Sequence, residues 1–263
     1  MNLRPKLLFG NWKCNKNLQE VSDYINFLNQ HWLEEKSNCI LGIAPTFLHL
    51  LTVKKELKNN KIVILAQDAF DQPSGAYTGA VSADQLAADG IKYTLIGHSE
   101  QRQLFHNDIN VVTQKLKAAV TANLTVVFCF GETLEDYENH RTEAVLKDQL
   151  ETTLKDLDTR YYKQVIFAYE PIWSIGTGKT ATLEQIQNII HYIRYKIIAN
   201  MWNSQVAIDN FILYGGSVNE NNVAEIINLA DVDGVLVGGA SLSPQTFINM
   251  AHKIMQIKSI KQN

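Results

Sequence analysis

The sequence has few of the features that mark secreted, metal-stapled or redox proteins. Its 263 residues contain three cysteines, Cys14, Cys39 and Cys129, and no two of them form a Cys-x-x-Cys pair. Widely spaced single cysteines are typical of a reducing compartment and offer no metal-binding motif. We therefore expect a cytoplasmic protein that needs neither disulfides nor a structural metal ion.

An excess of charge and a long apolar run are also missing. Lys and Arg number 24 against 27 Asp and Glu, so the formal net charge is −3 and the basic surplus of a nucleic-acid-binding protein is absent. No apolar run approaches the roughly 20 residues of a membrane span, and the first residues lack the apolar stretch of a signal peptide. The 46% hydrophobic composition, with 14 glycines and five prolines, excludes a disordered or collagen-like chain. We expect a globular protein with no nucleic-acid and no membrane partner.

What the sequence does contain is a regular alternation of short apolar runs with longer helical patterns. The runs start roughly 30 residues apart, about one βα unit. Several, such as Val126–Phe128, are apolar at every position, which favours a parallel sheet covered by helices on both faces. The predicted strands are Leu7–Asn11, Cys39–Ala44, Lys61–Gln67, Tyr93–Gly97, Thr125–Phe130, Gln164–Tyr169, Phe211–Tyr214 and Gly234–Val237.

Two of the intervening helices have clear start signals. Thr182 and Gln185 form a capping-box pattern ahead of an apolar stripe that runs to Ile197. Ser243-Pro244 combines a capping residue with a first-turn proline. Since no linker or composition break divides the chain, we expect one domain over residues 1–263, with a frayed tail at 258–263.

Eight βα units in one domain leave two architectures, a closed barrel and a doubly wound open sheet. An open sheet concentrates its ligand at one switch point, whereas a closed barrel builds its site from the loops after all of its strands. Polar, titratable and glycine residues follow most of the predicted strands: Asn11-Trp12-Lys13, Gly97-His98-Ser99-Glu100, Cys129-Phe130-Gly131-Glu132, Glu170-Pro171, Gly215-Gly216-Ser217 and Gly238-Gly239. This distribution favours the closed barrel.

Four of these residues are candidates for chemistry, and each has a plainer interpretation when taken alone. Glu170 could be a general base whose pKa is raised beside Ile172 and Trp173, or an exposed loop carboxylate. His98 stands just before a predicted helix start, where backbone N–H groups favour a neutral imidazole, but it could be an ordinary loop residue. Lys13 could be a surface lysine, and Cys129 is at least as compatible with a small buried side chain as with a reactive thiol.

Glycine clusters suggest a site for an anion. Gly176-Thr177-Gly178-Lys179-Thr180 resembles the end of a P-loop, but the required first glycine falls at Trp173. The same glycines match a relaxed dinucleotide fingerprint, which we reject because the segment is separated from its strand and lacks a ribose-binding acid near position 200. The remaining interpretation is a mobile lid whose backbone N–H groups bind an anion together with the glycines after the last two strands.

Taken together, these segments resemble the triosephosphate isomerase family over nearly the whole chain. The resemblance is carried by Gly10–Lys13, Gly97–Glu100, Tyr169–Pro171 with Gly176–Lys179, Tyr214–Ser217 and Asp233–Ser241. It implies an α/β fold, a single (β/α)8 TIM barrel of eight parallel strands with outer helices. It also implies a homodimer that interconverts dihydroxyacetone phosphate and D-glyceraldehyde 3-phosphate without a cofactor or metal.

The family resemblance assigns roles to individual residues. Glu170 would be the base and His98 the proton donor to the substrate oxygens, a pairing for which this family is the established example. Lys13 and Asn11 would stabilise developing charge, with Glu100 and Cys129 in support. The phosphate would be held by backbone N–H groups of Gly176, Ser217, Gly238 and Gly239. The lid would comprise Pro171, Ile172, Trp173, Ser174, Ile175, Gly176, Thr177, Gly178, Lys179, Thr180 and Ala181, and the dimer loop Gly75, Ala76, Tyr77, Thr78 and Gly79.

Several positions depart from the family pattern. Gln101, Asn107 and Ala80 replace an arginine and two glutamates at or near the dimer interface, which predicts a dimer with a less charged interface. Asp68 and Tyr137 replace an asparagine and an arginine, and Ser174 adds a hydroxyl to the lid. The alternatives are another phosphosugar barrel, for which the sequence shows no metal-ligand set, and a phosphate-binding barrel without turnover.

Overall fold

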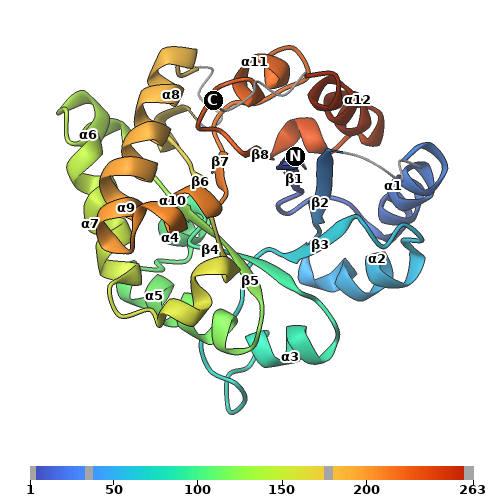
Figure 1. The fold of residues 1–263 in the computed structure, drawn as a ribbon. Helices are drawn as coiled ribbons and strands as arrows, with labels where there is room; N and C mark the ends of the chain where they lie inside the picture. The colour runs from blue at the N-terminus through green and yellow to red at the C-terminus, as the bar shows by residue number, and fades with distance from the viewer. Residues whose placement is uncertain (1–3, 33–37, 175–179, 258–263) are drawn as a thin grey trace.

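The structure, a computed structural model, describes residues 4–32, 38–174 and 180–257. Eight parallel strands pair in chain order, and the last pairs with the first to close a barrel (Figure 1). The strands are β1 (Lys6–Asn11), β2 (Cys39–Ala44), β3 (Val63–Ala66), β4 (Tyr93–Ile96), β5 (Thr125–Phe130), β6 (Val165–Tyr169), β7 (Ile212–Tyr214) and β8 (Gly234–Val237). The closed barrel that the sequence predicts is confirmed, and the open sheet is excluded.

Helices cover the outside of the barrel and connect the strands (Figure 1). The α-helices are α1 (Leu18–His31), α2 (Leu50–Glu56), α3 (Ala83–Ala88), α4 (Ser99–Leu104), α5 (Ile109–Thr121), α6 (Leu134–Glu138), α7 (Thr142–Leu154), α8 (Leu183–Tyr192), α9 (Ala199–Met201), α10 (Ser204–Asp209), α11 (Val223–Ile227) and α12 (Pro244–Met255). Shorter helical turns are η1 (Phe47–His49), η2 (Thr159–Gln164), η3 (Ile172–Ser174), the π-helical η4 (Ile193–Ile198) and η5 (Gly239–Ser241).

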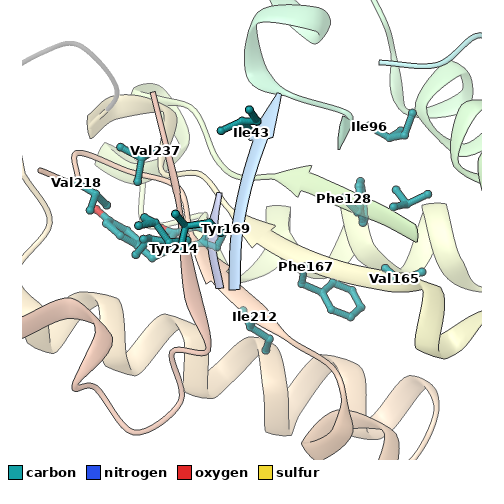
Figure 2. Close-up of a cluster of buried hydrophobic side chains, with 14 of the residues drawn as sticks. Ile43, Ile96, Phe128, Val165, Phe167, Tyr169, Ile212, Tyr214, Val218 and Val237 are labelled. Atoms are coloured by element: carbon teal, nitrogen blue, oxygen red, sulfur yellow. The ribbon is translucent and has the colours of Figure 1, made fainter. Parts of the chain in front are cut away.

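The strands bury both of their faces, in two separate cores. In β6, Val165, Phe167 and Tyr169 belong to the core between the barrel and its helices, whereas Ile166 and Ala168 belong to the core inside the barrel. Figure 2 shows the outer set, with side chains from β2 and from β4 to β8. Because alternate side chains of a strand point to opposite faces, full burial requires apolar residues at every position. This explains the continuous apolar runs in the sequence.

The predicted elements are found, with small differences at their ends. The strands predicted over β2, β5 and β8 have the same bounds in the structure. β3 begins two residues later than expected, because the Lys61 amide donates to Asn59 Oδ1 over 3.0 Å and closes a local turn. Gln164 ends the helical turn η2 instead of beginning β6.

Both predicted helix starts are confirmed. Thr182 Oγ1 accepts a hydrogen bond from the Gln185 amide, and Gln185 returns one to the Thr182 amide, as a capping box requires. Ser243 caps α12 by accepting from the Thr246 amide over 3.3 Å. The predicted apolar stripe runs through α8 and continues in η4, so one amphipathic face covers the barrel.

The tail at 258–263 lies outside the described residues, and so does the lid segment Ile175, Gly176, Thr177, Gly178 and Lys179. Within the described ranges, no helix is both long enough and apolar enough to span a membrane. All eight strands run in one direction, so their carboxyl ends meet at one rim of the barrel. The candidate residues that follow the strands therefore lie around that rim.

Candidate active site

A cavity of about 350 Å³ opens at the carboxyl-terminal rim of the barrel. Its walls come from β1 and β8 and from the loops after β1, β4, β6, β7 and β8. They comprise Asn11, Lys13, His98, Glu170, Gly215, Gly216, Ser217, Val218, Asn219, Leu236, Gly238, Gly239 and Ala240. The structure thus brings seven of the predicted site residues into one pocket, although they are spread over 229 positions from Asn11 to Gly239.

Glu170 is held in the pocket wall with only 1% of its surface exposed. It directly follows β6, and its amide donates to Phe130 O over 2.8 Å, which fixes the backbone against β5. One carboxylate oxygen, Oε2, accepts a hydrogen bond of 3.2 Å from the Ser99 amide. The other, Oε1, lies 3.4 Å from His98 Nε2. A buried carboxylate with one oxygen directed at the pocket is placed to take a proton from a bound molecule.

His98 lies beside Glu170 and is the residue that caps α4 at its amino-terminal end. Its Nδ1 accepts a hydrogen bond of 3.2 Å from the Glu100 amide. Because an amide can only donate, Nδ1 carries no proton, and the neutral ring must carry its proton on Nε2. The Nε2–H group therefore faces Glu170 and the cavity, where it can donate to an oxygen of a ligand.

Lys13 brings a positive charge to the same rim. Its backbone has a positive φ of 53°, a conformation that is uncommon outside glycine. Two side chains hold this conformation: Asn11 Oδ1 accepts from the Lys13 amide over 3.0 Å, and Gln67 Nε2 donates to Lys13 O over 2.9 Å. The carbon chain of Lys13 passes beside Gly238, where an added methyl carbon would lie 3.4 Å from Cε. Lys13 is thus positioned by backbone geometry and not only by its charge.

The two predicted supporting residues lie just outside the pocket lining. Glu100 Oε1 pairs with Lys13 Nζ at 2.8 Å, and its Oε2 lies 3.7 Å from His98 Nδ1. Cys129 is buried inside the barrel, and burial, reinforced by the nearby charge of Glu170, raises the pKa of its thiol well above the usual range. The thiol therefore stays protonated, so the structure favours the small buried side chain over the reactive thiol.

The predicted anion site consists of three short turns. Gly238 directly precedes the turn η5 and Gly239 begins it, at a place where the first amides of a helical turn have no partner within the turn. Gly239 is open on its Cα side, with no atom of the described chain within 4 Å of an added methyl carbon. The Ser217 hydroxyl donates to Ser174 O over 2.5 Å, so it is the backbone of Ser217 that remains for a ligand. Gly176 lies outside the described residues.

The described part of the predicted lid begins directly after Glu170. Pro171 leads into η3, which contains Ile172, Trp173 and Ser174, and Trp173 Nε1 donates to Glu132 Oε1 over 2.7 Å. The Ser174 hydroxyl donates to Pro171 O over 3.0 Å, so this departure from the family pattern is satisfied within its own turn. Thr180 and Ala181 lead into α8 on the other side of the segment that is not described.

Three groups that were not predicted from the sequence position the site. Gln67 follows β3 and ties Lys13 O to Ala44 O, the Ser99 amide holds Glu170, and Arg102 places its charge near Glu170. Burial lowers the pKa of Arg102 and the Glu170 charge raises it; among the described residues, Arg102 Nε and Nη2 have no hydrogen-bond partner. Gln67 could have been found from its position at a strand end, and Ser99 lies in the segment Gly97–Glu100 that the sequence singles out. No sequence signal marks Arg102 or shows that the Ser99 amide bonds to Glu170.

Glycine at position 131 makes room for the Glu170 backbone. An added methyl carbon there would lie 1.8 Å from Glu170 O, a distance that requires the backbone to move. We therefore expect Gly131→Ala to destabilise the fold by about 1–3 kcal/mol and to lower turnover at least about tenfold by displacing Glu170. Urea unfolding and steady-state kinetics on the purified variant would check this. Unchanged stability together with unchanged turnover would contradict the assigned packing.

Chemically, the pocket places a carboxylate and a neutral imidazole side by side, with an ammonium group and backbone amides around them. This arrangement can move a proton between neighbouring atoms of a bound anion. In the described part of the chain, no group of three or more His, Cys, Asp or Glu side chains is arranged to hold a metal ion.

Comparison with known proteins identifies the family. The family model described as triosephosphate isomerase matches residues 6–254. The triosephosphate isomerase of Mycoplasmoides gallisepticum is 44% identical over 250 residues, which cover 95% of this chain and 98% of that protein. Those of Mycoplasma pneumoniae and Chloroherpeton thalassium are 43% and 41% identical over 95% and 94% of this chain, and 98% of each relative is covered. Since barrel, pocket and sequence agree over nearly the full length, the chain belongs to the triosephosphate isomerase family.

Proposed function

We propose that this protein is an isomerase that interconverts dihydroxyacetone phosphate and D-glyceraldehyde 3-phosphate, an aldose–ketose step of glycolysis and gluconeogenesis, without a cofactor. The observation that carries the proposal is the 3.4 Å approach of Glu170 Oε1 to His98 Nε2 inside one cavity. In the three-carbon substrate, either of two neighbouring carbons can carry the carbonyl group. The reaction moves only hydrogen between these carbons and their oxygens. A base and a proton donor that face the same space suffice for this chemistry.

The roles of the residues follow from their positions. Glu170 removes a proton from the carbon next to the carbonyl to give an enediolate, the proton exchanges with solvent while the carboxyl group holds it, and Glu170 then gives a proton to the neighbouring carbon. His98 donates its Nε2 proton to the carbonyl oxygen and moves protons between the two oxygens. Lys13, oriented by Asn11, stabilises the negative charge that develops on these oxygens. Backbone amides of Ser217, Gly238 and Gly239, together with Gly176, hold the phosphate, and closure of the lid would exclude water.

The alternative, a phosphate-binding barrel without turnover, is not favoured. Binding of an anion alone would require the glycine turns and Lys13, but not a buried carboxylate facing a neutral imidazole. We further infer that the chain is a single domain over residues 1–263. We also expect a cytoplasmic location, on the basis of the glycolytic activity and the isolated cysteines.

The activity can be tested directly with purified protein. We expect dihydroxyacetone phosphate to be converted to D-glyceraldehyde 3-phosphate, detected by nuclear magnetic resonance, at the same rate with and without a metal chelator. A second measurement, calorimetry with inorganic phosphate, determines whether the same protein binds phosphate. Phosphate binding without any product would overturn the isomerase and favour the alternative.

We also propose that two copies of the chain form a homodimer through the loops after β2, β3 and β4. These consecutive loops expose large apolar side chains: Leu48 is 83% exposed, Leu104 68% and Phe105 66%. The predicted dimer loop Gly75–Gly79 protrudes between β3 and α3, and Tyr77 in it is 45% exposed (Figure 1). Neighbouring apolar surface of this kind is typical of a protein–protein interface.

Two polar pairs beside these loops support an interface with little net charge. Where the family carries arginine and glutamate, Asn107 Nδ2 donates to Gln101 Oε1 over 3.1 Å, a neutral pair. Asp68, where the family carries asparagine, pairs through Oδ2 with Lys115 Nζ at 2.5 Å, so its charge is matched within the chain. The residues at positions 68, 101 and 107 are thus each paired within the chain.

For the dimer, we expect Phe105→Asp to weaken association by about 30-fold or more, because a carboxylate would be buried without a partner. Sedimentation velocity over a range of protein concentrations measures this. The control is Ile208→Asp in α10, which changes another exposed apolar residue at the amino-terminal end of β7. A wild-type protein that sediments as a monomer at micromolar concentration would contradict the proposal.

A further inference from the structure

A second cavity, of about 260 Å³, lies behind the turn η3, outside the candidate active site. Its walls include residues of α6, α7, η3 and α8. The helices α6, α7 and α8 lie on the same side of the barrel (Figure 1). It shares no lining residue with the active-site pocket among the residues that the structure describes. Trp173 and Ala181, at the two ends of the predicted lid, line this cavity, but none of the residues proposed to act on the substrate does.

The shape and chemistry of the walls fit a flat, partly apolar molecule. The rings of Tyr137 and Trp173 are stacked, with centroids 4.3 Å apart and an interplanar angle of 25°. Ile186 and Ile189 of α8 supply aliphatic surface. Tyr137 is kept in place by Gln185 Nε2, which donates to its hydroxyl over 2.9 Å. Aromatic and aliphatic walls of this kind are typical of small-molecule sites.

The charge of the walls is of one sign. Glu132 is 0% exposed; its Oε1 accepts from Tyr169 Oη and Trp173 Nε1, at 3.0 Å and 2.7 Å. Its other oxygen, Oε2, is also buried, but it has no hydrogen-bond partner in the part of the chain that is described. Glu143 adds a second carboxylate to the lining, and no lysine, arginine or histidine is among the described lining residues.

An unpartnered buried carboxylate oxygen is costly unless a donor or a positive charge satisfies it. Burial raises the pKa of Glu132, which reflects this cost. A planar cation with N–H donors would offset the cost, and its flat body would pack against the aromatic walls with a favourable cation–π contribution.

We propose that this cavity is a second ligand site, which binds a small planar organic cation of the amidinium or guanidinium class through Glu132 and the Tyr137–Trp173 stack. The proposal does not rest on the isomerase activity. It depends only on the cavity, its carboxylates and its aromatic walls.

The test uses benzamidine as the probe and isothermal titration calorimetry on the full-length protein. We expect a dissociation constant of about 1 mM, as is usual for a ligand of this size, and at least tenfold weaker binding of benzamide, its neutral analogue. Saturating inorganic phosphate, which should occupy the active site, is expected not to compete with benzamidine: binding should persist, with at most a severalfold change in affinity through the lid residues Trp173 and Ala181.

Substitutions in the cavity test whether benzamidine binds there. Glu132→Gln should weaken benzamidine binding at least about tenfold by removing the charge. Ile189→Trp should abolish it by filling the cavity, and this second variant keeps the test valid if Glu132→Gln fails to fold. Ile208→Trp, on an exposed position outside the cavity, should bind like the wild type. Benzamidine binding no tighter than benzamide, displacement by phosphate, or full affinity in the folded Ile189→Trp variant would each overturn the proposal.

Discussion

Replacing Glu170 by glutamine is expected to reduce turnover by roughly 10²–10⁴-fold while the protein stays folded. The amide has nearly the shape of the carboxylate, and its oxygen can still accept the hydrogen bond from the Ser99 amide. It cannot, however, take a proton at neutral pH. The expected loss is therefore in kcat, which steady-state kinetics with dihydroxyacetone phosphate would measure.

The matched control for this substitution is Glu225→Gln, which makes the same chemical change at an exposed position of α11. It should leave kcat and stability unchanged. Binding of inorganic phosphate to Glu170→Gln should also stay close to the wild-type value, since Glu170 is not one of the proposed phosphate ligands. Turnover of Glu170→Gln within tenfold of the wild type would show that another group is the base.

Replacing Lys13 by methionine is expected to impair both binding and catalysis. The ammonium group faces the pocket beside Gly238 and is paired with Glu100. In the proposed mechanism it attracts the phosphate and also stabilises the enediolate oxygens. Loss of one preorganised electrostatic contact in an enzyme typically costs about 10²–10³-fold in turnover. We expect a loss of this size in kcat, together with a rise in KM.

The control is Lys163→Met. Lys163 is exposed in η2, just before β6, and so lies at the opposite end of the barrel from Glu170. The Lys163→Met substitution removes the same charge from the protein without changing the pocket. If Lys163→Met and Lys13→Met had the same KM, the effect of Lys13 would reflect net charge and not its position, and an unchanged KM in Lys13→Met would contradict the assigned role.

The fold was predictable because its strands are buried on both faces. A strand such as Thr125–Phe130 is buried on both faces and is therefore largely apolar. Continuous apolar runs separated by helical patterns can be recognised in a single sequence. The errors occur where a side chain bonds to the nearby backbone. Asn59 closes a turn on Lys61, and Asp158 accepts from the Arg160 amide at the start of η2. Such local bonds compete with the strand and are not visible as hydrophobic periodicity.

The site was predictable in part, for a similar reason. His98, Glu170 and Lys13 each follow a strand directly, and closure of the barrel brings strand ends together. Contacts between residues that are distant in the chain could not be predicted. The Ser99 amide that holds Glu170 is 71 residues away from it, and Asp68 and Lys115 are 47 apart.

Arg102 is another residue whose place near the site could not be predicted from the sequence. Its position in α4 looks like that of any exposed helix arginine, and only the packed structure places its charge near Glu170. Glu132 follows β5 and could be noticed in the sequence, but its role depends on Trp173, which is 41 residues away. Residue types and strand ends thus predict the participants in the site, and the packing decides how they are held.

The central claim is that Glu170 and His98 move a proton between neighbouring carbons of a bound triose phosphate. It is tested most directly by incubating the wild-type protein with dihydroxyacetone phosphate in deuterium oxide and following the carbon-bound hydrogens by nuclear magnetic resonance. The proposed mechanism predicts D-glyceraldehyde 3-phosphate with deuterium at the carbon next to the carbonyl group, and no such labelling with Glu170→Gln. Product that carries no solvent deuterium, or equal labelling by the wild type and Glu170→Gln, would contradict it.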